Sequence, residues 1–164
     1  MTVRTVTVGV GEIGVSASIG DKITALGLGS CVALVMLDIH ATVAGLAHVA
    51  LPAAASDRDR ALRPLAYFAD AGIEELIDAM MRAGGDSDPR RYIVKIAGGA
   101  SLMDPNGIFA IGRKNTAELR TGLRQRGMVL RAADVGGALS RSVCVQVGLD
   151  QILVSSPGRQ TWAI

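Results

Sequence analysis

The sequence predicts an α/β protein with a single domain, and three observations support that prediction. The chain has 164 residues, which is enough for one well-buried core but short for two domains. Hydrophobic residues make up 49% of the chain and aromatic residues only 3%, so the core must consist of small aliphatic side chains. Apolar residues recur with the period of strands in most segments and with that of a helix in others.

The N-terminal third is predicted to form β-structure. Thr and Val alternate across Arg4–Val10, and similar patterns follow in Ile13–Ser18 and Lys22–Leu26. Val32–Ile39 and Val43–Val49 are nearly continuous apolar runs, which is typical of strands buried on both faces.

A polar loop and a long helix are expected next. Ser56–Arg63 contains two Asp and three Arg residues, and we expect a mobile surface loop there that could gate a site. Apolar residues then follow a helical period across Leu65–Ala83, and the pair Gly84–Gly85 ends the pattern.

The C-terminal half combines strands with a second helix. The expected elements are a strand at Tyr92–Ala97, a helix at Asn115–Arg126, and strands at Met128–Ala132, Ser142–Val147 and Gln151–Ser155. Pro157–Ile164 has no clear pattern and is expected to be a loose tail. The domain is therefore predicted to span residues 1–156.

Charge and hydropathy exclude several classes of protein. With 17 basic and 15 acidic residues, the net charge of +2 is too balanced for a nucleic-acid-binding surface. Neither a signal peptide nor an apolar stretch long enough to span a membrane is visible, so we expect a cytoplasmic protein without membrane insertion. Its two cysteines should then remain reduced.

The segment Gly9–Gly14 has the glycine spacing of a dinucleotide-binding loop. Such a loop binds a pyrophosphate only where a helix starts within it. Val15–Ile19 continues the strand-like alternation instead, so the sequence favours a glycine-rich hairpin turn.

Cys31 is the main candidate for a catalytic residue. It follows Gly27-Leu28-Gly29-Ser30 and precedes a buried strand, so its thiol should stand at a rigid strand edge where the backbone can approach a ligand. The alternative is a buried structural cysteine. Cys144 lies within a strand pattern without a glycine frame, and we assign it to packing.

His48 lies in the apolar run after the Cys31 strand and is a candidate general base for that thiol. A buried histidine without a catalytic role is the alternative, and the two interpretations are compatible. His40 is expected in an exposed turn. A metal site formed by Cys31, His40 and His48 is disfavoured because their spacing matches no common zinc motif, and no metal is expected.

Five segments, taken in order, resemble the CheD family, the chemoreceptor glutamine deamidases of bacterial and archaeal chemotaxis. They are Leu26–Ala33, Ala47–Pro52, Lys95–Ser101, Ile111–Asn115, and Asp134–Gly137 with Arg141–Val143. The resemblance implies an α/β/β layered sandwich related to bacterial toxin deamidases. It also implies that Cys31 is the nucleophile and His48 its partner, with no cofactor.

The implied reaction starts with attack of the thiolate on the side-chain carboxamide of a glutamine and proceeds through a thioester to glutamate. An imidazole partner should lower the pKa of the thiol. Backbone amides of two glycine-rich segments are candidates for binding the substrate oxyanion. The candidate residues are Gly29, Ser30, Gly98, Gly99 and Ser101.

One position departs from the family pattern. Where the family commonly has a threonine that orients the histidine, this chain has Ala25, with Thr24 one place earlier. Thr24 could supply the hydroxyl only through a bulge or register shift, because neighbouring strand residues face opposite sides.

This departure keeps other functions open. The resemblance implies chemoreceptor cytoplasmic domains as substrates and a CheC-type phosphatase as a further partner. The chain could instead be a catalytically weak docking module for those partners. A thiol-dependent hydrolase or transamidase with another substrate would use the same site.

Overall fold

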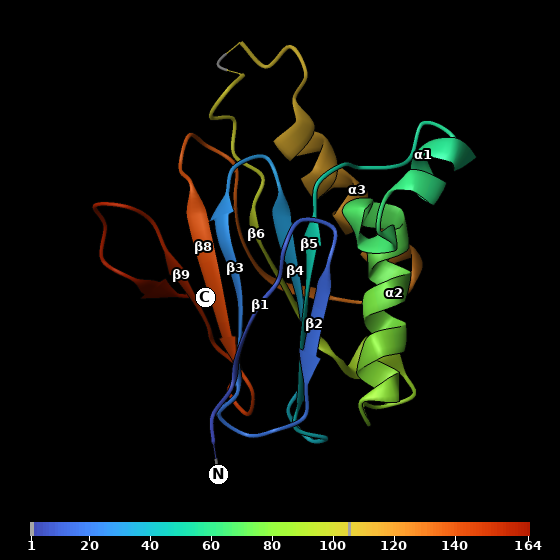
Figure 1. Ribbon diagram of the computed structural model, residues 1–164, viewed down its shortest axis with the longest axis vertical. Coiled ribbons are helices and arrows are strands. Elements are labelled where there is room, and N and C mark those ends of the chain that lie inside the picture. Colours follow the sequence, from blue (N-terminus) through green and yellow to red (C-terminus); the bar gives the residue numbers. More distant parts are fainter. Residues whose placement is uncertain (1, 105) are drawn as a thin grey trace.

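The computed structural model describes residues 2–104 and 106–164 and has three layers (Figure 1). Two five-stranded sheets lie face to face, and helices cover the outer face of one of them. The predicted α/β/β sandwich is confirmed.

The two sheets are built from strands that are far apart in the sequence. Sheet A contains, in spatial order, β1 (Thr5–Thr7), β3 (Lys22–Leu28), β8 (Arg141–Gln146), β9 (Ile152–Ser155) and β10 (Trp162–Ala163). Sheet B contains, in spatial order, β2 (Ile13–Ser16), β5 (Val43–Val49), β4 (Val32–Asp38), β6 (Ile93–Gly98) and β7 (Leu130–Val135). The helical elements are α1 (Asp57–Leu62), η1 (Leu65–Tyr67), α2 (Ala69–Arg82), η2 (Pro89–Arg91) and α3 (Ile111–Gln125).

Sheet B is covered on both faces, which explains the continuous apolar runs of its central strands. In β4, Val32, Leu34 and Met36 belong to the core beneath α2 and α3. Ala33 and Val35, which alternate with them, belong to the core between the two sheets. Each of these strands therefore contributes to two separate cores.

The Gly9–Gly14 segment runs into strand β2 and not into a helix, as predicted. The predicted hairpin is wrong, because β1 pairs with β3 in sheet A whereas β2 pairs with β5 in sheet B. Gly11 has a φ of +80° and its N–H donates to the His48 carbonyl at 2.8 Å. The glycines thus form a turn that brings the chain alongside β5.

The expected mobile loop at Ser56–Arg63 was wrong, because most of it forms helix α1. Ser56 caps this helix by accepting a hydrogen bond from Asp59 N at 3.2 Å. Arg60 forms an ion pair with Asp70 of α2, with Nη2 and Oδ2 2.8 Å apart. These contacts give the segment a defined conformation that its charge content did not indicate.

The helix predicted at Leu65–Ala83 is divided into η1 and α2 by Phe68, whose backbone is extended. Leu51 and Phe68 form a β-bridge, and Leu51 N donates to Tyr67 O at 3.0 Å. This tertiary pairing outweighs the helical pattern of the apolar residues.

Helix α3 begins at Ile111, four residues before the predicted start. The Asp104 carboxylate accepts hydrogen bonds from the N–H groups of Ile108, Phe109 and Ala110 and so orders the segment leading into the helix. These are loop contacts with no helical period, so the sequence pattern did not reveal them.

The C-terminal residues are not a loose tail. Trp162 and Ala163 form β10 against β9, and Ile164 exchanges backbone hydrogen bonds with Ile152 at 3.0 and 3.1 Å. The Trp162 indole N–H also donates to Asp134 of β7, so the segment joins the two sheets.

No helix within residues 2–104 and 106–164 is long and apolar enough to cross a membrane.

Candidate active site

Cys31 lies in the short connection between β3 and β4, where the chain crosses from sheet A to sheet B. It is half-buried and packs against the core between the sheets. The backbone of Gly98 approaches it so closely that a Cβ on Gly98 would lie 2.3 Å from the Cys31 carbonyl oxygen. Only glycine fits at position 98, where φ is also +118°.

The second glycine-rich segment holds the Cys31 connection in place. Gly99 N donates to Cys31 O, and Ala100 N donates to Gly29 O, both at 2.8 Å. The N–H groups of Ser30 and Cys31, by contrast, donate to no other group among the described residues. Of the two candidate oxyanion-binding segments, Ser30 and Cys31 therefore have available donors, whereas Gly99 already uses its N–H.

His48 is buried and lies close to Cys31 in the sheet. Ala33 and His48 are directly paired between β4 and β5, so Cys31 is a diagonal neighbour of His48. Ala44 and Leu46 of β5 contribute to the core between the sheets, and period-two alternation puts His48 on that same face. The His48 ring thus faces the core between the sheets, against which Cys31, in the connection before β4, also packs.

The ring of His48 is held by a main-chain oxygen. Nδ1 lies 3.2 Å from Val8 O, which can only accept, so the neutral ring carries its proton on Nδ1. This leaves the Nε2 lone pair available as a base. Burial lowers the pKa of His48, although the hydrogen bond to Val8 and the charge of Glu12 oppose that effect.

Burial raises the pKa of the Cys31 thiol. The expectation of a lowered value was wrong for this structure, because desolvation disfavours the thiolate and the neighbouring imidazole is neutral. The pair therefore rests as a thiol and a neutral imidazole.

Thr24 is not placed to orient His48. Its hydroxyl lies 3.2 Å from Thr7 Oγ1 and donates to Val6 O at 3.4 Å, within sheet A. Ala25, which is fully buried, faces the core between the sheets. The bulge in β3 follows Ala25, too late in the strand to bring Thr24 to that face.

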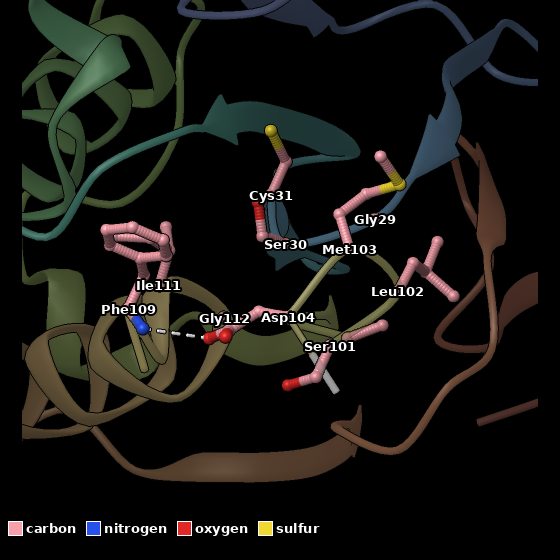
Figure 2. Close-up of a pocket in the computed structure, with 11 residues that line it drawn as sticks. Gly29, Ser30, Cys31, Ser101, Leu102, Met103, Asp104, Phe109, Ile111 and Gly112 are labelled. Atoms are coloured by element: carbon pink, nitrogen blue, oxygen red, sulfur yellow. Dashed lines mark hydrogen bonds between the residues drawn. The ribbon is translucent and has the colours of Figure 1, made fainter. Parts of the chain in front are cut away.

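A cavity of about 410 Å³ opens beside Cys31. Of the candidate substrate-binding residues, Gly29, Ser30 and Ser101 contribute to its wall, whereas Gly98 and Gly99 do not line it. Figure 2 shows two apolar side chains on each side of Cys31, and Asp104 accepting the hydrogen bond from Phe109 N. The apolar residues are Leu102, Met103, Phe109 and Ile111.

The remaining candidates lie away from this cavity. Cys144 is half-buried and pairs with Thr24 and Leu153, which puts it on the outer face of sheet A and not in a core. His40 is exposed in the turn between β4 and β5.

A family model described as CheD chemotactic sensory transduction matches residues 50–156 of this chain. The chain belongs to the CheD family. A probable chemoreceptor glutamine deamidase CheD of Syntrophotalea carbinolica is 38% identical over 156 residues, which cover 95% of this chain and 96% of that protein.

Two further CheD relatives match over similar lengths. The chemoreceptor glutamine deamidase CheD of Thermotoga maritima is 35% identical over 92% of this chain and 91% of that protein. A probable chemoreceptor glutamine deamidase, CheD 2 of Anaeromyxobacter dehalogenans, is 39% identical over 92% of this chain and 94% of that protein.

Two contacts near Cys31 and His48 in this CheD chain could not be read from the sequence pattern of those residues. Val8 supplies a backbone oxygen, a role that leaves no signal in a single sequence. Asn115 binds the backbone next to Cys31 from α3. A polar residue within the inward face of an amphipathic helix was the available signal for Asn115.

Proposed function

We propose that this chain is a chemoreceptor glutamine deamidase that converts glutamine side chains of receptor cytoplasmic domains to glutamates. The observation that carries the proposal is the placement of Cys31 at the edge of a cavity, with the neutral His48 as its diagonal neighbour on the adjacent strand. The names of the relatives describe the same conversion, the deamidation of chemoreceptor glutamines.

The proposed reaction uses groups already described. Nε2 of His48 takes the thiol proton as Sγ of Cys31 attacks the carboxamide carbon and forms a tetrahedral oxyanion. The N–H groups of Ser30 and Cys31 are the proposed donors to that oxyanion. The C–N bond then breaks as the imidazolium protonates the departing ammonia, and water hydrolyses the thioester to release glutamate and restore the thiol.

The composition of the cavity suits a glutamine on the surface of a protein helix. Met103 and Phe109 are 96% and 67% exposed, so apolar side chains border the entrance to the thiol. Such a border can contact the aliphatic stem of the glutamine and apolar neighbours on the same helix face. A free amino acid would leave most of this surface uncovered.

Mass spectrometry of a purified receptor cytoplasmic fragment tests the proposal. Incubation with the wild-type protein should add about 1 Da at specific glutamines, because an amide becomes an acid. Cys31→Ala should give no conversion, while Cys144→Ala should act at the wild-type rate. Equal conversion by wild type and Cys31→Ala would exclude Cys31 as the nucleophile.

The second candidate is a docking module that binds receptors or a CheC-type phosphatase without turnover. It is favoured by Ala25, since the face beside His48 carries a methyl group in place of the hydroxyl implied by the resemblance. Titration of the same receptor fragment separates the two functions. Saturable binding without any mass change would support docking alone.

A further inference from the structure

Asn115, in the first turns of α3, is a fully buried polar residue with 0% exposure. Its Nδ2 donates to Ser30 O and to Ala50 O, each at 3.0 Å. Both partners are carbonyl oxygens, so the amide can bind them in one orientation only. The reversed amide would set its own oxygen against two acceptors.

The two carbonyls lie just beyond the end of a strand pair. The pairing of β4 with β5 ends at Val32 and Val49, one residue after Cys31 and one residue after His48. Strand ends open more easily than strand centres. Asn115 bridges the chains beyond that last pair and so closes the end at which the thiol and the imidazole stand.

Peptide planarity gives the bond to Ser30 a specific consequence. The Ser30 carbonyl and the Cys31 N–H belong to the same trans peptide and point in opposite directions. Holding the carbonyl on Asn115 therefore fixes the direction of the Cys31 N–H. The neighbouring carbonyls of Gly29 and Cys31 are held by backbone groups, and that of Ser30 is held by this side chain.

The other half of the amide indicates that stability is not the main role of Asn115. Its Oδ1 is buried and has no hydrogen-bond partner within the part of the chain that the structure describes. A buried acceptor without a partner costs folding free energy. A side chain that carries this cost while making two well-placed donor contacts is better explained by positioning.

We propose that Asn115 is a positioning residue that fixes the Ser30–Cys31 peptide, so that the Cys31 N–H is directed at the oxyanion formed on the thiol. The predicted effect of Asn115 on the reaction rate rests on the proposed deamidase function. The structural consequence, a fixed Cys31 backbone, can be tested without any substrate.

The kinetic test compares Asn115→Leu with wild type on the receptor fragment. Leucine has a similar volume and no donor, so kcat should fall about 10²–10³-fold, as it does when an oxyanion donor is lost. KM should change by less than about threefold, because the contact acts in the transition state. A kcat within about twofold of wild type would overturn the proposal.

Leu119→Ala is the matched control. Leu119 is fully buried on the same helix one turn later, and its truncation destabilises the core without removing a contact to Ser30. It should lower the thermal midpoint while leaving kcat near the wild-type value. If Asn115→Leu behaves as this control does, its role is only structural and the proposal fails.

The rate of Cys31 alkylation tests the fixed backbone even if the protein proves not to be a deamidase. In Asn115→Leu, the released backbone should let the Cys31 thiol become hydrated, so its alkylation at neutral pH should accelerate at least about threefold while that of Cys144 stays constant. An alkylation rate of Cys31 equal to that of wild type would contradict the proposal that Asn115 fixes the Cys31 backbone, even if the wild-type protein deamidates no glutamine. Should Asn115→Leu fail to fold, Asn115→Ser, which cannot reach both carbonyls, is measured against the same criteria.

Discussion

Burial of the His48 ring links the active site to the pH dependence of folding. Its pKa in the folded protein lies below the ordinary value of 6.5, so the unfolded chain takes up the proton at a higher pH than the folded chain does. The contribution of this residue to the free energy of unfolding is therefore complete above that value and is lost as the pH falls below it.

We expect His48→Asn to reduce this loss. Urea denaturation between about pH 7 and pH 5 should show a smaller decrease in the free energy of unfolding than in wild type. His40→Asn, at an exposed position, should retain the wild-type slope. The lowered pKa of Asp21 acts below its ordinary value of 3.8 and so lies outside this interval. Identical slopes in wild type and His48→Asn would contradict the lowered pKa.

The protonation state of the pair also predicts the pH dependence of catalysis. Because burial raises the pKa of Cys31 above its ordinary value of 9.0, only a small fraction is thiolate at neutral pH. Neutral His48 takes the thiol proton during the attack, so the reactive form is the pair of thiol and neutral imidazole. We therefore expect kcat/KM to stay level between about pH 7 and pH 9 and to fall as the pH decreases through the His48 pKa, which lies below 6.5. A rise of tenfold per pH unit from pH 7 to about pH 9 would instead show that free thiolate attacks without His48 as its base.

Thr24→Ala tests which face of β3 matters to the chemistry. Thr24 contacts Thr7 in sheet A, so we expect its removal to leave the deamidation rate within about twofold of wild type. His48→Asn should lower the rate about 10²–10⁴-fold through loss of the base. Ammonia release measures both variants. Comparable losses would mean that β3 shifts its register when substrate binds.

Cys31 and His48 could be selected as candidates from the sequence because their signals are local. Four preceding residues frame the thiol, and the histidine interrupts an apolar run. The contacts that hold His48 and the Ser30 carbonyl could not be predicted, since Val8 is 40 residues from His48 and Asn115 is 85 residues from Ser30. Such partners depend on how the sheets and α3 are packed, and a single sequence does not record that packing.

At the scale of the elements, the end of β6 lies very close to the connection between β3 and β4 that carries Cys31, and this contact can be tested directly. Gly98→Ala would place a Cβ 2.3 Å from the Cys31 carbonyl, whereas Gly84→Ala meets no atom within 4 Å although its φ of +101° is similarly strained. Both variants should lower the thermal midpoint. Only Gly98→Ala should also lower kcat, by at least about tenfold, because it displaces the nucleophile.

The strands were easier to predict than the helices. Most predicted strands match observed ones because their alternation reflects burial that repeats along the sheet. The helical period of Leu65–Ala83 was real, but the pairing of Phe68 with Leu51 interrupts it. The charged α1 depends on its Ser56 cap and on an ion pair with α2, neither of which is periodic.

At the scale of the whole molecule, the C-terminal segment fastens the two sheets together close to the site. Trp162 donates to Asp134, which also forms an ion pair with Arg141 at 3.1 Å. Arg141 in turn donates to the carbonyl of Gly136 at 3.0 Å. One connected group of side chains thus links β10, β7 and β8.

We expect Trp162→Phe to lower the free energy of unfolding by about 1 kcal/mol, since it removes one hydrogen bond and keeps an aromatic ring. Circular dichroism in urea is the suitable probe, because Trp162 is the chain's single tryptophan and its fluorescence is lost. Arg159→Ala, an exposed change in the same segment, should have little effect. Equal stability of Trp162→Phe and wild type would show that the segment is held by its backbone alone.

The hydrogen bond between His48 and the Val8 carbonyl affects how the sequence of this protein can evolve. A threonine hydroxyl can be lost by one nucleotide change, whereas a main-chain oxygen is present whatever residue is encoded at that position. Drift at position 25 can then proceed without releasing the imidazole. The selective constraint moves to the turn after β1, whose path keeps the Val8 carbonyl within reach of the ring.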